Sequence, residues 1–244
     1  MSGHSKWATI RNQKASTDAK RGAVFTKLAR NITVAARDKG GDPEMNAALR
    51  SAIDKAKEFN MPKDNIERAI KRGAGELEGA NIEEITYEAF GPEGIALIIK
   101  CITDNRNRTV SNIRHILTKH GGSLGEANTV LWMFEEKGVL RFSKAQLNEK
   151  NISRDEFELS IIDAGAEDIK DEEAEMAIYA NAKDLHKIKG AVEEKNISAE
   201  SAQLEWIAKN EVDINEESKE KIERLFEALG DDEDVQEVYS NVKM

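Results

Sequence analysis

The sequence predicts an α+β fold in which an N-terminal three-helix bundle is followed by two ferredoxin-like α+β domains. Three observations lead to this prediction. Amphipathic helical segments fill the first 75 residues, the order of elements after residue 79 is ββαβ and then βαββαβ, and charge changes sign between the two parts. At 244 residues, the chain is also longer than one typical domain.

Residues 16–39 carry the spacing of an amphipathic helix. Apolar side chains recur every three or four positions and predict one buried stripe: Val24, Leu28, Ile32 and Ala35. At about 100° per residue, four basic side chains fall roughly opposite that stripe: Lys20, Lys27, Arg30 and Arg37. This helix is therefore predicted to be apolar on one side and basic on the other.

Two shorter helices are predicted after a glycine and proline stop at residues 40–43. One spans residues 44–59, with Leu49, Ile53 and Ala56 facing inward, and the other begins with Pro62 at its first position and ends at Gly73. Basic residues project from the outer side of the third helix: Arg68, Lys71 and Arg72. The tight turn between these helices is typical of helix-turn-helix proteins, although many three-helix bundles that do not bind DNA share it.

The second part begins with a predicted hairpin of residues 85–90 and 95–102, a helix at 108–120 and a strand at 129–134. The next unit is predicted to contain, in order, a strand at 139–142, a helix at 153–164, strands at 167–170 and 176–180, a helix at 184–195 and a strand at 202–207. A helix at 216–229 and a strand at 235–240 complete the earlier unit. The predicted domains are therefore 1–78, then 79–134 with 209–244, and between these an inserted domain, 135–208.

The net charge of −10 hides two opposite populations. Residues 1–75 contain 16 Lys or Arg and 8 Asp or Glu, a net of +8, whereas residues 76–244 contain 20 and 38, a net of −18. A basic segment on an acidic protein attracts phosphates to one part of the chain. Three further cations lie ahead of the first helix: Lys6, Arg11 and Lys14.

Arg106 and Arg108 lie outside the basic segment, where a predicted strand gives way to a helix. Free backbone N–H groups at a helix start favour anions, so these arginines are candidates for a second phosphate contact. In the alternative reading, Asp104 or Asn105 caps the helix and the arginines pair with neighbouring acids.

Common signatures of enzymes are missing from the sequence. Neither a Gly-x-x-x-x-Gly-Lys phosphate loop nor a Gly-x-Gly-x-x-Gly fingerprint occurs. His115 and His120 are five residues apart, so one helix does not present both on one side to a metal. We predict that the protein is not an enzyme and uses no cofactor, metal or small-molecule substrate. A carboxylate-metal nuclease and an adaptor that binds only proteins are the alternatives.

The sequence predicts a cytoplasmic protein with no membrane partner. No stretch approaches the roughly 18 apolar residues that a membrane span needs, and the first residues lack the apolar core of a signal peptide. Cys101 lies in the apolar run 94–102, which predicts a buried strand residue rather than a reactive thiol.

Ordered motifs in the first 140 residues resemble the YebC family. They include Gly-His-Ser-Lys-Trp-Ala at 3–8, Gly-Gly-Asp-Pro at 40–43, Met-Pro-Lys-Asp at 61–64 and Thr-Asp-Asn-Arg-Asn-Arg-Thr at 103–109. The resemblance implies a three-domain α+β protein. It also implies a role in gene expression, since bacterial members are described as probable transcriptional regulators and mitochondrial relatives as translational activators for cytochrome c oxidase subunit I. Bacterial members have further been linked to relief of ribosome stalling at proline runs.

The sequence therefore predicts a DNA-binding transcriptional regulator that contacts phosphates through basic N-terminal helices. The alternative is a translation factor that binds ribosomal RNA, with the ribosome rather than the transcription machinery as its partner. The predicted nucleic-acid-binding residues are Lys6, Arg11, Lys14, Lys20, Lys27, Arg30, Arg37, Arg68, Lys71, Arg72, Arg106 and Arg108.

Overall fold

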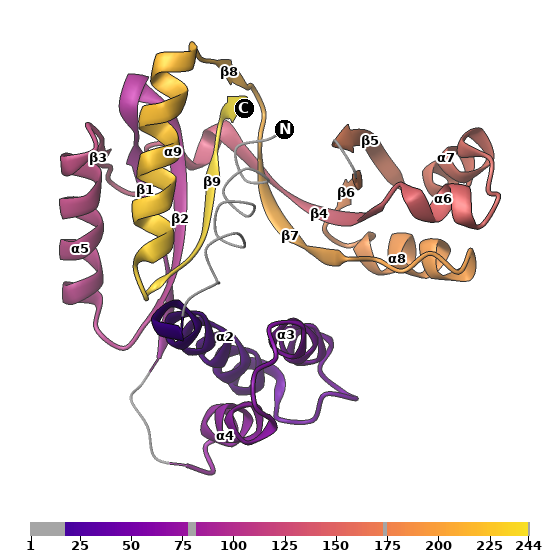
Figure 1. Cartoon of the computed structure of the whole chain (residues 1–244), viewed down its shortest axis with the longest axis horizontal. Coiled ribbons are helices and arrows are strands. Elements are labelled where there is room, and N and C mark those ends of the chain that lie inside the picture. The colour runs from indigo at the N-terminus through magenta and orange to yellow at the C-terminus, as the bar shows by residue number, and fades with distance from the viewer. Residues whose placement is uncertain (1–17, 78–81, 173–174, 244) are drawn as a thin grey trace. The chain divides into compact units, whose positions relative to one another are not determined.

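The computed structural model describes residues 18–77, 82–172 and 175–243 (Figure 1). The described residues divide into two compact units. One runs from residue 132 to residue 211, and the other joins the residues before 132 to those after 211. The predicted α+β class is confirmed, since N-terminal helices are followed by two antiparallel sheets.

The helical part consists of α2 (Asp18–Lys39), α3 (Ala47–Glu58) and α4 (Lys63–Gly73). The apolar spacing explains their packing, because the predicted inward residues Leu28, Ile32, Leu49 and Ile53 lie in one buried cluster with Ile66 of α4. All three helices were predicted from this periodicity, and the predicted inward face of α3 is confirmed.

Asn46 fixes the chain between α2 and α3. Its side chain is fully buried, and its Oδ1 caps α3 by accepting a hydrogen bond from the Leu49 N–H at 3.0 Å. Its Nδ2 donates to the carbonyl oxygens of Ala35 and Gly40 at 2.7 and 2.8 Å. One side chain thereby satisfies groups at the end of α2 and at the start of α3.

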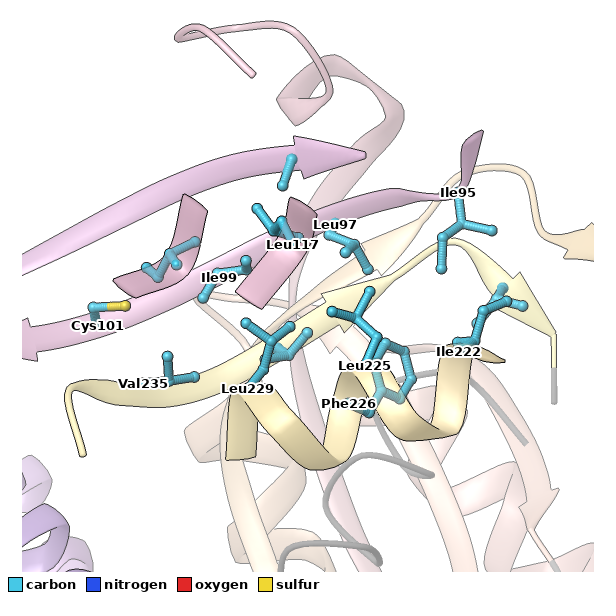
Figure 2. Close-up of a cluster of buried hydrophobic side chains, with 14 residues drawn as sticks. Ile95, Leu97, Ile99, Cys101, Leu117, Ile222, Leu225, Phe226, Leu229 and Val235 are labelled. Atoms are coloured by element: carbon cyan, nitrogen blue, oxygen red, sulfur yellow. The ribbon is translucent and has the colours of Figure 1, made fainter. Parts of the chain in front are cut away.

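The first sheet has the strand order β3-β1-β2-β9. Its strands are β1 (Glu83–Phe90), β2 (Ala96–Thr103), β3 (Ser123–Leu124) and β9 (Val235–Ser240), and every pair is antiparallel. Helices α5 (Arg106–Lys119) and α9 (Glu216–Asp231) supply side chains to one buried cluster with this sheet. Figure 2 shows Leu225, Phe226 and Leu229 of α9 beside Ile99 and Val235 of the sheet.

The C-terminal residues complete this first sheet, as the sequence predicts. Strand β9 pairs with β2 in the register Leu97 to Ser240 and Ile99 to Val238. Two further short strands, β8 (Val212–Asp213) and β10 (Val242–Lys243), pair in parallel. Cys101 is fully buried in β2, so its predicted burial is confirmed.

The unit formed by residues 132–211 has a second antiparallel sheet. It contains β4 (Phe134–Ser143), α6 (Ala145–Glu149), α7 (Arg154–Asp163), β5 (Ala166–Glu172), β6 (Glu175–Asn181), α8 (Leu185–Glu194) and β7 (Ser201–Ala208). The strand order β5-β6-β4-β7 is that of the predicted ferredoxin-like arrangement. Side chains of α7 and α8 join one core, in which Phe142 and Phe157 meet edge to face with ring centroids 5.3 Å apart.

The predicted strand at 129–134 is wrong. Residues Leu131–Met133 form a short 3-10 helix, and β4 begins only at Phe134. The buried carboxylate of Glu88 explains the difference, because it accepts hydrogen bonds from the N–H groups of Asn128, Val130 and Leu131 at 2.6 to 2.7 Å. These N–H groups are thereby taken from any strand ladder.

The predicted strand boundary at Gly138 is also wrong, since β4 continues through this residue. A Cβ at this position would lie 2.8 Å from Cβ of Leu185 on α8. Glycine is therefore required for close packing of α8 on the sheet and does not mark a turn.

Candidate nucleic-acid interface

The predicted contact residues separate into groups with different surroundings. Lys6, Arg11 and Lys14 lie outside the described residues. Lys20 belongs to the described backbone of α2. The side chains of the remaining eight are described. Their contacts separate cations that are exposed to solvent from cations that are hydrogen-bonded to oxygens of the protein.

Arg68, Lys71 and Arg72 form the α4 cation set. All three are exposed, and within the described part of the chain none of them makes a hydrogen bond or ion pair. Their spacing of three and four residues places them near one another on the helix surface. The buried residues Ile66 and Ala69 take the other side of α4. This arrangement gives α4 a solvated cationic side and an apolar side held in the bundle.

The α4 helix is held close to α2 by Gly73. A Cβ at this position would lie 2.3 Å from the Thr33 carbonyl oxygen and 2.7 Å from the Ala36 Cβ. The Thr33 hydroxyl also donates to the Ala69 carbonyl oxygen at 3.2 Å. Both contacts lie on the inner side of α4, so the α4 cation set is carried by a helix packed directly on α2.

Lys27 and Arg30 are not on an exposed side of α2, which corrects the expectation from helical spacing. Lys27 is 7% exposed, and its Nζ donates to the Gly230 carbonyl oxygen at 2.7 Å. Arg30 Nη1 donates to the Glu233 carbonyl oxygen at 2.6 Å and to Asp234 Oδ1 at 2.8 Å. The side of α2 opposite the bundle core therefore contacts the last turn of α9 and the segment between α9 and β9.

Asp234 is the centre of this contact. Its side chain is 2% exposed and accepts hydrogen bonds from Arg30, Arg108, Thr103 and Thr109. The hydrogen bond to Asp234 is the main reason that the pKa of Arg108 lies above its usual range. Lys27, Arg30 and Arg108 are called the inner cations below, because each donates to buried or backbone oxygens of the protein, although the Arg108 side chain is itself 46% exposed.

At the start of α5, Asn105 caps the helix and Arg108 pairs with a neighbouring acid, as the alternative to a phosphate contact predicts. Asn105 Oδ1 accepts a hydrogen bond from the Arg108 N–H at 3.1 Å, and Arg108 Nη2 donates to Asp104 Oδ1 at 2.8 Å. Arg106 is 65% exposed and lies 3.7 Å from a Glu83 oxygen. An exposed pair at this distance is weak, so Arg106 is held less firmly than Arg108.

Arg37 lies at the end of α2 and is 42% exposed. Its guanidinium pairs with Asp38 at 3.0 Å and donates to the Ile82 carbonyl oxygen. Both Arg37 and Arg106 are therefore partly exposed cations with protein partners. Sequence reasoning missed Asp234, because its only signal is an acidic run at residues 231–234 that resembles many solvated turns.

In the described part of the chain, no three His, Cys, Asp or Glu side chains are grouped in a way that could hold a metal ion. None of its helices is both long enough and apolar enough to cross a membrane.

Two family descriptions match nearly the whole chain. Residues 5–76 match the TACO1/YebC protein N-terminal domain, and residues 82–242 match the TACO1/YebC second and third domain. A protein of Persephonella marina is 53% identical over all of this chain and 96% of its own length. A protein of Halothermothrix orenii is 50% identical over 99% of this chain and 94% of its own length. Both relatives are named probable transcriptional regulatory protein.

A solved structure is similar along the same length. The crystal structure of a conserved hypothetical protein from Aquifex aeolicus aligns with a TM-score of 0.82 and 44% sequence identity, covering 94% of this chain and 93% of that one. With both parts of the chain matched and half of its residues shared with full-length relatives, the chain belongs to the TACO1/YebC family.

Proposed function

We propose that this protein is a cytoplasmic, DNA-binding regulator of transcription that is not an enzyme. The observation that carries the proposal is the α4 cation set, Arg68, Lys71 and Arg72, which is exposed and makes no hydrogen bond or ion pair within the described residues. The relatives named probable transcriptional regulatory protein support the choice of transcription.

Electrostatics explains why the α4 cation set is the better phosphate site. A phosphate that approaches Arg68, Lys71 or Arg72 displaces only water and counterions, which is the main source of affinity for nucleic-acid backbones. A phosphate that approached the inner cations would have to compete with Asp234 and with backbone carbonyl oxygens. Phosphate binding to the α4 cation set is therefore more favourable than phosphate binding to the inner cations.

The other proposed contacts come from the basic N-terminal segment and from two exposed arginines. Lys6, Arg11, Lys14 and Lys20 remain predicted contacts, and the exposure of Arg37 and Arg106 suits a place at the rim. The net of −18 on residues 76–244 repels phosphates from most other surfaces and so favours one orientation of the bound nucleic acid.

Crosslinking in cells tests the proposal directly. The native protein and the triple variant Arg68→Gln, Lys71→Gln, Arg72→Gln are crosslinked, and the attached DNA and RNA are sequenced. A matched control replaces three cations of α9, Lys219, Lys221 and Arg224, with Gln and removes the same charge. We expect DNA on the native protein and the control, and its loss from the α4 variant. Recovery of ribosomal RNA alone would instead establish the translation-factor alternative.

A further inference from the structure

Helix α7 is apolar on two opposite sides. Phe157 and Ile161 are fully buried in the core of the second sheet. Leu159 and Ile162, in contrast, are 64% and 55% exposed. They are three residues apart and therefore lie near each other on the helix surface. A helix that only covers a core keeps its outer side polar, so this aliphatic pair has no role in the packing of its own unit.

Three exposed carboxylates surround the aliphatic pair. At about 100° per residue, Asp155, Asp163 and Glu156 fall on the same outer side of α7 as Leu159. Among the described residues, none of the three makes an ion pair or a side-chain hydrogen bond. Arg154 of the same helix pairs instead with Glu158 and Asp171, at 2.6 and 2.8 Å.

The charge of the surrounding unit selects the kind of partner. Residues 132–208 contain 18 acidic and 10 basic side chains, so the unit repels phosphates and attracts cations. Symmetric pairing of two α7 helices would place unpaired carboxylates against one another. The basic helices α2 and α4 of a second copy offer no aliphatic side, because their apolar residues form the bundle core.

We propose that the outer side of α7 is a docking surface for a basic, amphipathic segment of another protein. Aliphatic side chains of that segment would cover Leu159 and Ile162, while its lysines or arginines would pair with Asp155, Glu156 and Asp163. The proposal goes beyond DNA binding, since it assigns a protein partner to a helix outside the basic segment. It stands whether or not the α4 cation set binds DNA.

A peptide titration on the full-length protein tests this surface. The probe is a synthetic helical peptide of Lys and Leu with leucines at three- and four-residue spacing, and the control peptide has the same composition with its leucines scattered around the helix. Affinity is measured for the native protein, for Leu159→Gln with Ile162→Gln, and for Leu204→Gln. Leu204 is the matched control, because it is a 41% exposed leucine of the same unit.

We expect the double variant to bind the amphipathic peptide at least about tenfold more weakly, and Leu204→Gln to bind it as the native protein does. Neutralising Asp155, Glu156 and Asp163 should also weaken binding and remove most of its salt dependence. Equal affinity of the double variant, or equally tight binding of the scattered peptide, would overturn the proposal.

Two further measurements separate other occupants. Binding of duplex DNA should be the same for the native protein and the double variant, and a loss in the variant would assign α7 to the nucleic-acid surface instead. In sedimentation, the native protein should not self-associate through this surface, so the native protein and the double variant should behave alike at all concentrations. Such an association would make a second copy of this chain the occupant and would contradict the proposal.

Discussion

Arg30 on α2 donates a hydrogen bond to Asp234 at 2.8 Å, joining residues 204 positions apart in the chain. Asp234 is almost completely buried and receives Arg108 as well. A basic side chain that the charge pattern assigns to phosphate is therefore satisfied within the protein. The contact shows that the sign of a side chain's charge does not separate binding cations from structural ones.

Replacing Asp234 with Asn should lower the free energy of unfolding by about 3 kcal/mol, because it leaves the largely buried Arg30, as well as the half-exposed Arg108, without their carboxylate. Urea unfolding measures the change. Glu233→Gln is the control, since its side chain is exposed and only its backbone carbonyl contacts Arg30. The control should change stability by less than about 0.5 kcal/mol. Equal effects of the two variants would show that the Asp234 contact adds nothing.

Gly73→Ala should destabilise the protein by about 1–3 kcal/mol, because the new Cβ would meet the Thr33 carbonyl oxygen and force α4 away from α2. Helix propensity alone predicts the opposite sign, with a gain of up to about 1 kcal/mol. Gly190→Ala in α8 provides the comparison, because nothing lies within 4 Å of its added Cβ. Thermal unfolding should therefore shift down for Gly73→Ala and up for Gly190→Ala. A stabilised Gly73→Ala variant would refute the close approach.

Glu88→Gln should free the segment that follows β3. The buried carboxylate accepts three backbone N–H groups, and an amide replaces one accepting oxygen with a donor. We expect a loss of about 2 kcal/mol and faster hydrogen exchange at Asn128, Val130 and Leu131. Glu84→Gln on the same strand should change neither, since Glu84 makes only an exposed pair with Lys100. Unchanged hydrogen exchange at these three amides would show that the Glu88 carboxylate does not hold them in place.

The thiol of Cys101 should be inert in the folded protein. Burial, followed by the negative charges of Asp232 and Asp234, raises its pKa, so little of the reactive thiolate forms. Thiol reagents should label it only after unfolding in urea. Above the usual thiol pKa of about 8.5, the unfolded chain ionises while the folded chain does not, so stability should fall as pH rises. Rapid labelling of the native protein at mildly alkaline pH would contradict this.

Periodicity predicted all three N-terminal helices and most strands, because those signals depend on neighbouring residues. It misplaced the strand at 129–134, where Glu88 accepts hydrogen bonds from backbone N–H groups 40 to 43 positions away. Distance along the chain also limited the prediction of the site. The neighbouring sequence does not distinguish the buried Lys27 from the exposed Lys71. The partner of Lys27 is the carbonyl oxygen of Gly230, which is 203 positions away, and helical spacing predicts nothing about such a distant contact.

The salt dependence of DNA affinity tests the role of the α4 cation set most directly. Affinity for a duplex is titrated against salt for the native protein, for the Gln variant of Arg68, Lys71 and Arg72, and for the Gln variant of Lys219, Lys221 and Arg224. If about five cations engage phosphates, the native slope of log affinity against log salt should be near −4.5. Removing three contacts should reduce its magnitude by about 2.7, and the α9 control should keep the native slope. Equal slopes for the two triple variants would show that the α4 cation set does not contact phosphates.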